Sequence, residues 1–272
     1  MKQEIIDAHT HVFPENVAPK VLDSNRALGF DAFGEGTLGD LRGRMHKLGI
    51  NACVVLAVST LPRLVEPSNS WLLRERDEEM IPFGTIHPEY QGYRQEIKRI
   101  KAMGARGIKF SSLFQDFYPD DRNMYPVYDV LVEEELPVLF HVGGSMRSIE
   151  GEEAMASPRR IARVLNDFPE MKVIGAHWGG FHALEEARKH LWGRDLYLDT
   201  SYPPGLNTVP LKAILEFIEA HGPNRILFAS DYPFGDQESD IGIIQDLPLD
   251  SEARYRILYG NAAELFGIEK RD

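Results

Sequence analysis

The sequence predicts an α/β protein built as a single (β/α)8 barrel, and three observations support this. Short apolar segments rich in β-branched residues alternate with longer amphipathic segments, a pattern typical of parallel βα units. There are eight apolar segments, the number of strands in such a barrel. The chain has 272 residues, close to the roughly 250 of this architecture. We therefore expect one domain over residues 1–272, a barrel that is regular or slightly distorted, with long βα loops on its C-terminal face.

The strand segments are short and bounded by turn residues. Several are almost entirely apolar, as strands buried on both faces are. They are predicted at residues 4–8, 52–58, 81–86, 105–110, 137–141, 172–176, 196–199 and 225–230.

Helix start and stop signals stand between these strands. Gly49 and Gly104 each follow an apolar stripe of helical period, as C-capping glycines do. Ser157 and Pro158 supply an N-cap and a first-turn proline. Helices are predicted at residues 37–48, 92–103, 157–168, 208–220 and 251–266, the last with a break near residue 260.

Three connections are long and rich in Gly, Pro, Asp and Ser: residues 12–36, 111–124 and 142–156. They follow the first, fourth and fifth predicted strands. In a barrel of this class these loops lie on the C-terminal face, where active sites are built. Long loops in compact domains are usually functional.

Composition excludes several function classes. The formal net charge of -12 disfavours nucleic-acid binding, which depends on clustered Lys and Arg. No apolar run reaches eighteen residues, so we expect no membrane span. The N-terminus enters a strand pattern at once and leaves no room for a signal peptide, which predicts a cytoplasmic protein. The one cysteine, Cys53, lies in an apolar run and is interpreted as a buried thiol.

The first chemical signal is the pair His9 and His11, which follows an apolar strand start. Side chains at i and i+2 of an extended segment point the same way, so both imidazoles can reach one metal ion. Such a pair also arises by chance, and by itself it is modest evidence.

Ligand-type residues also end other predicted strands. Lys109, His141, His177 and Asp231 stand at or just after the ends of the fourth, fifth, sixth and eighth strands. Parallel strands of a barrel end at one rim, so these side chains are expected to converge on the histidine pair. Six titratable groups at one rim favour catalysis over a structural metal site or an inert ligand-binding barrel.

With these motifs the sequence resembles the amidohydrolase superfamily, and in particular its amidohydrolase-2 branch of metal-dependent decarboxylases, hydratases and lactonases. The resemblance runs from residue 4 to about 267 and is specific for the superfamily, much less for the substrate. The matching segments are 7–11, 107–109, 140–143, 175–180, 229–233 and 257–266.

The resemblance implies roles for these residues. In single-metal members, the positions of His9, His11, His141 and Asp231 hold one divalent ion. Zinc suits three imidazoles and a carboxylate, and manganese, iron or cobalt also fit. His177 is then the general acid or base, and Asp231 shuttles a proton in addition to ligating.

Lys109 leaves two alternatives open. In two-metal members a lysine at this place is carbamylated and bridges two ions; His141 and His177 would then bind the second ion, and the other ligands the first. Otherwise its ammonium binds a substrate carboxylate or pairs with a local acid. Arg147 and Trp178 are candidate substrate contacts, Arg147 because guanidinium grips carboxylates.

The sequence-based hypothesis is a metal-dependent hydrolase of a small-molecule amide, ester or lactone. The alternative is a lyase on the same site, a non-oxidative decarboxylase or hydratase of a carboxylated small molecule. We expect a small-molecule substrate, and a homo-oligomer is compatible with the family. Neither nucleic acid nor membrane is an expected partner.

Overall fold

The computed structural model describes residues 4–144 and 155–268. Its residues cluster into two compact units, which we describe one at a time. The first unit comprises Met1–Val55, Glu79–Ile81 and Leu198–Asp272, and the second comprises Leu56–Glu78 and Pro82–Tyr197. That residues 1–272 form one domain stays a prediction.

Eight strands form one sheet whose order follows the chain from β1 to β8, and one or more helices follow every strand. This is the (β/α)8 barrel that the sequence predicts. Each strand overlaps its predicted segment. The bounds are β1 (Ile6–His11), β2 (Ala52–Leu56), β3 (Met80–Thr85), β4 (Gly107–Phe110), β5 (Val138–Phe140), β6 (Val173–Gly175), β7 (Tyr197–Asp199) and β8 (Ile226–Leu227).

In the first unit, the last strands of the chain lie beside the first. β7 pairs in parallel with β8 through Leu198 and Ile226. The Ala8 amide of β1 donates to the carbonyl of Phe228, just after β8, at 2.8 Å. The C-terminal ends of β7, β8 and β1 therefore meet within this unit.

The second unit carries four parallel strands of this sheet, namely β3 from Pro82 onward, β4, β5 and β6. Its register places Lys109 of β4 between Thr85 of β3 and Leu139 of β5. The β5 and β6 strands are completely buried, which explains their uniformly apolar sequences.

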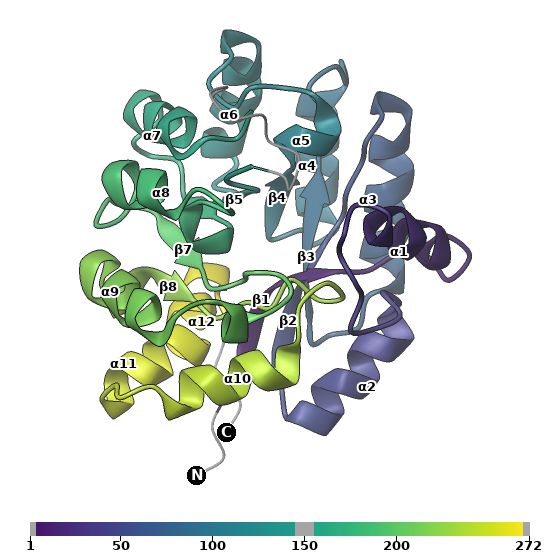
Figure 1. The fold of residues 1–272 in the computed structure, drawn as a ribbon. Coiled ribbons are helices and arrows are strands. Elements are labelled where there is room, and N and C mark those ends of the chain that lie inside the picture. Colours follow the sequence, from purple (N-terminus) through teal and green to yellow (C-terminus); the bar gives the residue numbers. More distant parts are fainter. Residues whose placement is uncertain (1–3, 145–154, 269–272) are drawn as a thin grey trace. The chain divides into compact units, whose positions relative to one another are not determined.

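The caps predicted at Gly49 and Ser157 are confirmed, and Gly104 directly follows Met103, the C-cap residue of the helix before it. The Thr37 side chain accepts from the Asp40 amide before α2, and Gly49 ends that helix with φ 72°. Ser157 caps α7 through the Arg160 amide. The helices (Figure 1) are α1 (Ala18–Arg26), α2 (Leu38–Leu48), α3 (Val65–Glu75), α4 (Tyr93–Ala102), α5 (Ser112–Gln115), α6 (Tyr125–Glu133), α7 (Pro158–Asp167), α8 (Leu184–His190), α9 (Leu211–His221), α10 (Gln237–Asp246), α11 (Ser251–Tyr255) and α12 (Asn261–Phe266).

Four expectations need correction. The connection at residues 12–36 contains the helix α1, although it reads as a loop in the sequence. The connection at residues 111–124 likewise contains the short helix α5 and a 3-10 turn, Arg122–Met124. The helix predicted from residue 208 begins only at Leu211, because Leu206–Thr208 forms a separate 3-10 turn. The predicted break near residue 260 is a π-helical segment, Arg256–Gly260, which joins α11 to α12 without interruption.

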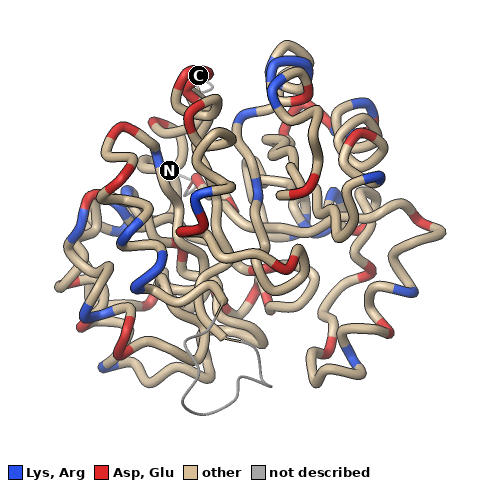
Figure 2. The backbone as a smooth tube through the Cα atoms, turned by 90° about the horizontal axis from the view of Figure 1, so that it is seen from above, with Lys and Arg blue, Asp and Glu red and all other residues tan. Residues whose placement is uncertain are grey.

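Charged residues of both signs are interspersed along the backbone, with acidic residues in excess (Figure 2). In the part of the chain that the structure describes, no helix combines the length and apolar character that crossing a bilayer requires.

One buried carboxylate belongs to the scaffold of the first unit. Asp240 of α10 has no solvent exposure, and its Oδ1 accepts a hydrogen bond from the Leu206 amide at 2.7 Å. Its burial raises its pKa to about 8, and the nearby charges of Asp7 and Asp236 act in the same direction.

Asp240 makes stability depend on pH. The pKa of Asp240 is higher in the folded chain than in the unfolded chain. Its contribution to the stability of the fold is therefore fully present below the unfolded-state pKa of about 4, and it is lost as the pH rises towards 8. We expect the free energy of unfolding of Asp240→Asn to rise relative to that of the wild type as the pH increases, by at most about 1.4 kcal/mol per pH unit. Urea unfolding between pH 5 and 8 measures this. The control is Asp246→Asn, on the exposed side of the same helix. If the free energies of unfolding of Asp240→Asn and the wild type differed by the same amount at every pH, the raised pKa of Asp240 would be contradicted.

Candidate metal centre

Three predicted ligands meet in the first unit. His9 and His11 lie two residues apart on β1 and point to the same side, and Asp231 follows β8. The Nε2 atoms of His9 and His11 are 3.2 Å apart. Asp231 Oδ1 lies 3.2 Å from the first nitrogen and 3.1 Å from the second. We call these three residues the ligand triangle.

The ligand triangle has the dimensions of half a coordination shell. Atoms bound to one ion at about 2.1 Å are about 3.0 Å apart in cis octahedral positions and about 3.4 Å apart in a tetrahedron. The measured 3.1–3.2 Å falls between these values. Asp231 Oδ1, one corner of the triangle, is buried and accepts no hydrogen bond within the described residues. The donor set therefore fits a divalent metal ion.

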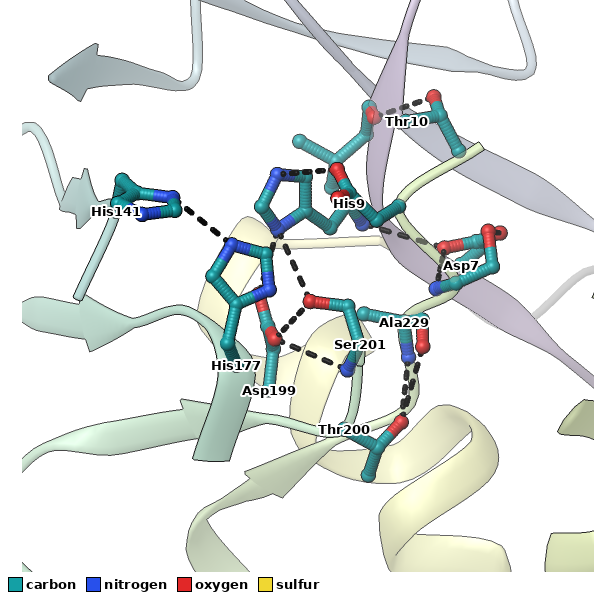
Figure 3. Close-up of polar contacts among 12 residues, drawn as sticks. Asp7, His9, Thr10, His141, His177, Asp199, Thr200, Ser201 and Ala229 are labelled. Atoms are coloured by element: carbon teal, nitrogen blue, oxygen red, sulfur yellow. Dashed lines mark hydrogen bonds and ion pairs between the residues drawn. The ribbon is translucent and has the colours of Figure 1, made fainter. Parts of the chain in front are cut away.

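His9 is oriented by Asp199, a carboxylate at the end of β7 (Figure 3). Its Nδ1 donates to Asp199 Oδ2 at 2.8 Å, and both side chains are fully buried. Asp199 is held in turn by the Ser201 hydroxyl, which donates to its Oδ1 at 2.6 Å. With the proton fixed on Nδ1, the Nε2 lone pair of His9 faces His11 and Asp231 as a ligand must.

Two predicted catalytic residues have an unusual backbone. Asp231 has φ 64° and His177 has φ 59°, and Trp178 follows with φ 61°. The left-handed region costs a non-glycine residue about 1–2 kcal/mol. Such strain persists where the surrounding structure imposes it, and it gathers at functional sites.

In the second unit, His141 and His177 stand together after β5 and β6 (Figure 3). His177 Nε2 lies 3.0 Å from His141 Nδ1, and the ring centroids are 4.7 Å apart. His177 is buried. This spacing suits a hydrogen bond between the rings, and it suits two nitrogens on one ion, so the pair fits both metal-count hypotheses.

The remaining predicted residues differ in their surroundings. Lys109 is buried on β4, with 2% of its surface exposed. A charged ammonium group can be buried in this way only where it has a polar or charged partner. Trp178 is 1% exposed, and its carbonyl accepts from Trp192 Nε1 at 3.0 Å. Arg147 lies outside the described residues.

Sequence reasoning missed Asp199, Ser201 and Asp7, which surround the ligand triangle. Asp199 carries the same signal as the ligands, a titratable residue that ends an apolar strand, here the seventh. Asp7 is completely buried, and burial raises its pKa to about 6. Asp7 was also detectable from the sequence. It is an acidic residue within the first apolar strand, and such a residue requires hydrogen-bonding partners in the core.

Comparisons with known proteins extend over the whole chain. The family model described as Amidohydrolase matches residues 6–268. The crystal structure of 5-carboxyvanillate decarboxylase from Sphingomonas paucimobilis has a TM-score of 0.72 at 17% identity, covering 98% of this chain and 100% of that chain. 2,6-Dihydroxybenzoate decarboxylase from Rhizobium gives 0.71 at 16% identity and covers 98% of both chains.

A third similar structure was solved with a metal ion. It is 5-carboxyvanillate decarboxylase from Novosphingobium aromaticivorans, complexed with manganese and 4-hydroxy-3-methoxy-5-nitrobenzoic acid. Its TM-score is 0.73 at 16% identity, with coverage of 98% of this chain and 97% of that chain. At these identities the three likenesses show the fold, which is the (β/α)8 barrel.

We expect the double variant His9→Ala/His11→Ala to lose bound metal, because two of the three atoms of the ligand triangle disappear. Its circular dichroism should remain close to that of the wild type. Metal content per chain after purification and dialysis measures the effect. The control replaces His46 and His190, which lie on α2 and α8, and should keep the wild-type content. Full retention in the His9/His11 variant would overturn the assignment.

Proposed function

The chain belongs to the amidohydrolase family, and on that premise we propose that it is a metal-dependent lyase that removes CO2 from a small carboxylated molecule. The observation that carries the metal dependence is the ligand triangle. The choice of decarboxylation is supported by similar structures that are named decarboxylases. The sequence alone put hydrolysis first, and these comparisons favour its alternative.

The proposed metal centre holds one divalent ion through the ligand triangle and His141. The support for His141 is that it follows β5, and the parallel strands of this sheet end at the same edge. Manganese is the ion of one similar structure, and zinc remains chemically suitable. When bound, the ion would supply Lewis-acid polarisation of a substrate oxygen.

Decarboxylation also needs a proton. The bond between the substrate carbon and its carboxylate breaks, CO2 leaves, and the vacated carbon takes up one proton. We assign that proton to Nε2 of the buried His177. This nitrogen lies 3.0 Å from His141 Nδ1, so the substrate carbon would take the proton from a place beside the proposed ligand His141. Asp231 is proposed as a second proton carrier.

The metal count tests the role of Lys109. A single-ion centre predicts one equivalent of metal per chain and a Lys109 that stays an unmodified amine, a group that can meet a substrate carboxylate. Two equivalents, together with a carbamate signal in 13C NMR after labelling with 13C-bicarbonate, would assign Lys109 as a bridge. His141 and His177 would then be ligands of the second ion.

The reaction class is tested on metal-loaded protein with a panel of hydroxylated aryl carboxylates labelled with 13C at the carboxyl group. We expect labelled CO2 and, in D2O, one deuterium at the vacated carbon. Parallel reactions with lactones, esters and amides in H2-18O detect hydrolysis by incorporation of 18O into the product acid. Turnover only in the second set would replace the lyase by the hydrolase.

We expect His177→Ala to keep its metal and to lose activity by about 10²–10⁴-fold in kcat, the usual contribution of a general acid or base. Steady-state kinetics and metal analysis on the same preparation measure both. The control is His190→Ala, whose Nε2 pairs with Glu186 on α8. Loss of metal from His177→Ala would instead favour the two-ion centre.

A further inference from the structure

Asp7 is a buried carboxylate at the centre of the first unit, two residues before His9. It has no solvent exposure and accepts four hydrogen bonds. Its Oδ1 accepts from the amides of Ser230 at 3.0 Å and His9 at 3.2 Å. Its Oδ2 accepts from the Ser230 hydroxyl at 2.6 Å and from Gln237 Nε2 at 2.9 Å. Both oxygens are therefore occupied by protein donors, and Asp7 is not itself a ligand.

The donors to Asp7 come from both segments that carry the ligand triangle. His9 belongs to β1, and Ser230 directly precedes Asp231. The Ser230 hydroxyl also accepts from the Tyr232 amide at 3.0 Å. The residues on both sides of Asp231 are thus tied to one carboxylate.

Backbone contacts complete this arrangement. The Asp231 amide donates to the His9 carbonyl at 2.9 Å, and the His11 amide donates to the Tyr232 carbonyl at 2.6 Å. The Ser230 carbonyl is approached so closely by Gly235 that a Cβ there would lie 1.9 Å from the oxygen. This packing leaves the turn at Asp231 little room to relax from its left-handed backbone.

We propose that Asp7 is the positioning residue of the metal centre: it fixes Asp231 against β1 and thereby sets the 3.1–3.2 Å spacing of the ligand triangle. The inference rests on the proposed metal site. A carboxylate is required because only a group with two acceptor oxygens and no donor can receive all four hydrogen bonds at once. An asparagine would present an NH2 group to one pair of these donors.

The test is the affinity of the metal-depleted full chain for Mn²⁺, titrated and followed by EPR. We expect Asp7→Asn to raise the Kd by about 10–100-fold, the usual effect of removing a group that orients a ligand. The EPR spectrum of the Mn²⁺ that still binds should also change, because the backbone bonds between β1 and the turn at Asp231 remain but the side-chain bonds that fix Ser230 and Tyr232 on Asp7 are weakened. A purely structural role would lower the unfolding temperature without altering this spectrum.

Asp240→Asn is the matched control. Asp240 is a buried aspartate of the same unit that acts on Asp7 through its charge alone, because its Oδ1 accepts its hydrogen bond from the Leu206 amide, which is no part of the ligand triangle. Its Kd and spectrum should equal those of the wild type. If Asp7→Asn does not fold, Ser230→Ala replaces it, because this variant keeps the carboxylate and removes only the hydroxyl that links Tyr232 to it. We expect a smaller increase in Kd, with the same spectral change.

The outcomes separate the two proposals. A wild-type chain that binds no Mn²⁺ or Zn²⁺ contradicts the proposed function. A wild-type chain that binds the ion, with Asp7→Asn showing the same Kd and spectrum, overturns the positioning role alone. Where Asp7→Asn does not fold, an unchanged Ser230→Ala has the same meaning.

Discussion

The close approach of three buried electron-rich atoms is the constraint on which this part of the fold depends. Two imidazole nitrogens and a carboxylate oxygen within 3.1–3.2 Å of one another require positive charge among them, from protons or from a metal ion. Alternation along β1 brings the imidazoles to one side, and the pairing of β1 with the segment after β8 brings the carboxylate. Asp199 then fixes which nitrogen of His9 faces the centre.

Holding these atoms together has a stability cost. Asp7, Asp199 and Asp240 are carboxylates without solvent exposure, and each charged form loses hydration on folding. Burial accordingly raises the pKa of Asp7 and of Asp240. Hydrogen bonds offset much of this loss, as the four donors to Asp7 illustrate. A fully buried apolar strand such as β2 supplies favourable free energy that lets the first unit retain these carboxylates.

The features that could be predicted from the sequence are those that depend on local residue patterns. Strand position follows from short apolar runs, and the ends of those runs point to His9, His11 and Asp231 as one group. It did not predict α1, whose stretch contains Gly, Pro and Asn and only a weak stripe. It also gave no sign that Ser230 meets Asp7, because these residues are 223 positions apart and meet only through strand pairing. Asp199 also ends an apolar strand, but its hydrogen bond to His9, which shows that it orients a ligand, is visible only in the structure.

The proposed metal centre would suit a hydrolase or a lyase, because both reactions first need a polarised substrate oxygen. They differ in where a proton must go. Hydrolysis needs a base that removes a proton from water, whereas decarboxylation needs an acid that delivers one to carbon. A buried histidine such as His177 can act as the base or as the acid. Its left-handed backbone fixes the position of the ring but does not determine which of these roles it takes. Substrate orientation, set by the loops after the strands, therefore decides the reaction on this fold.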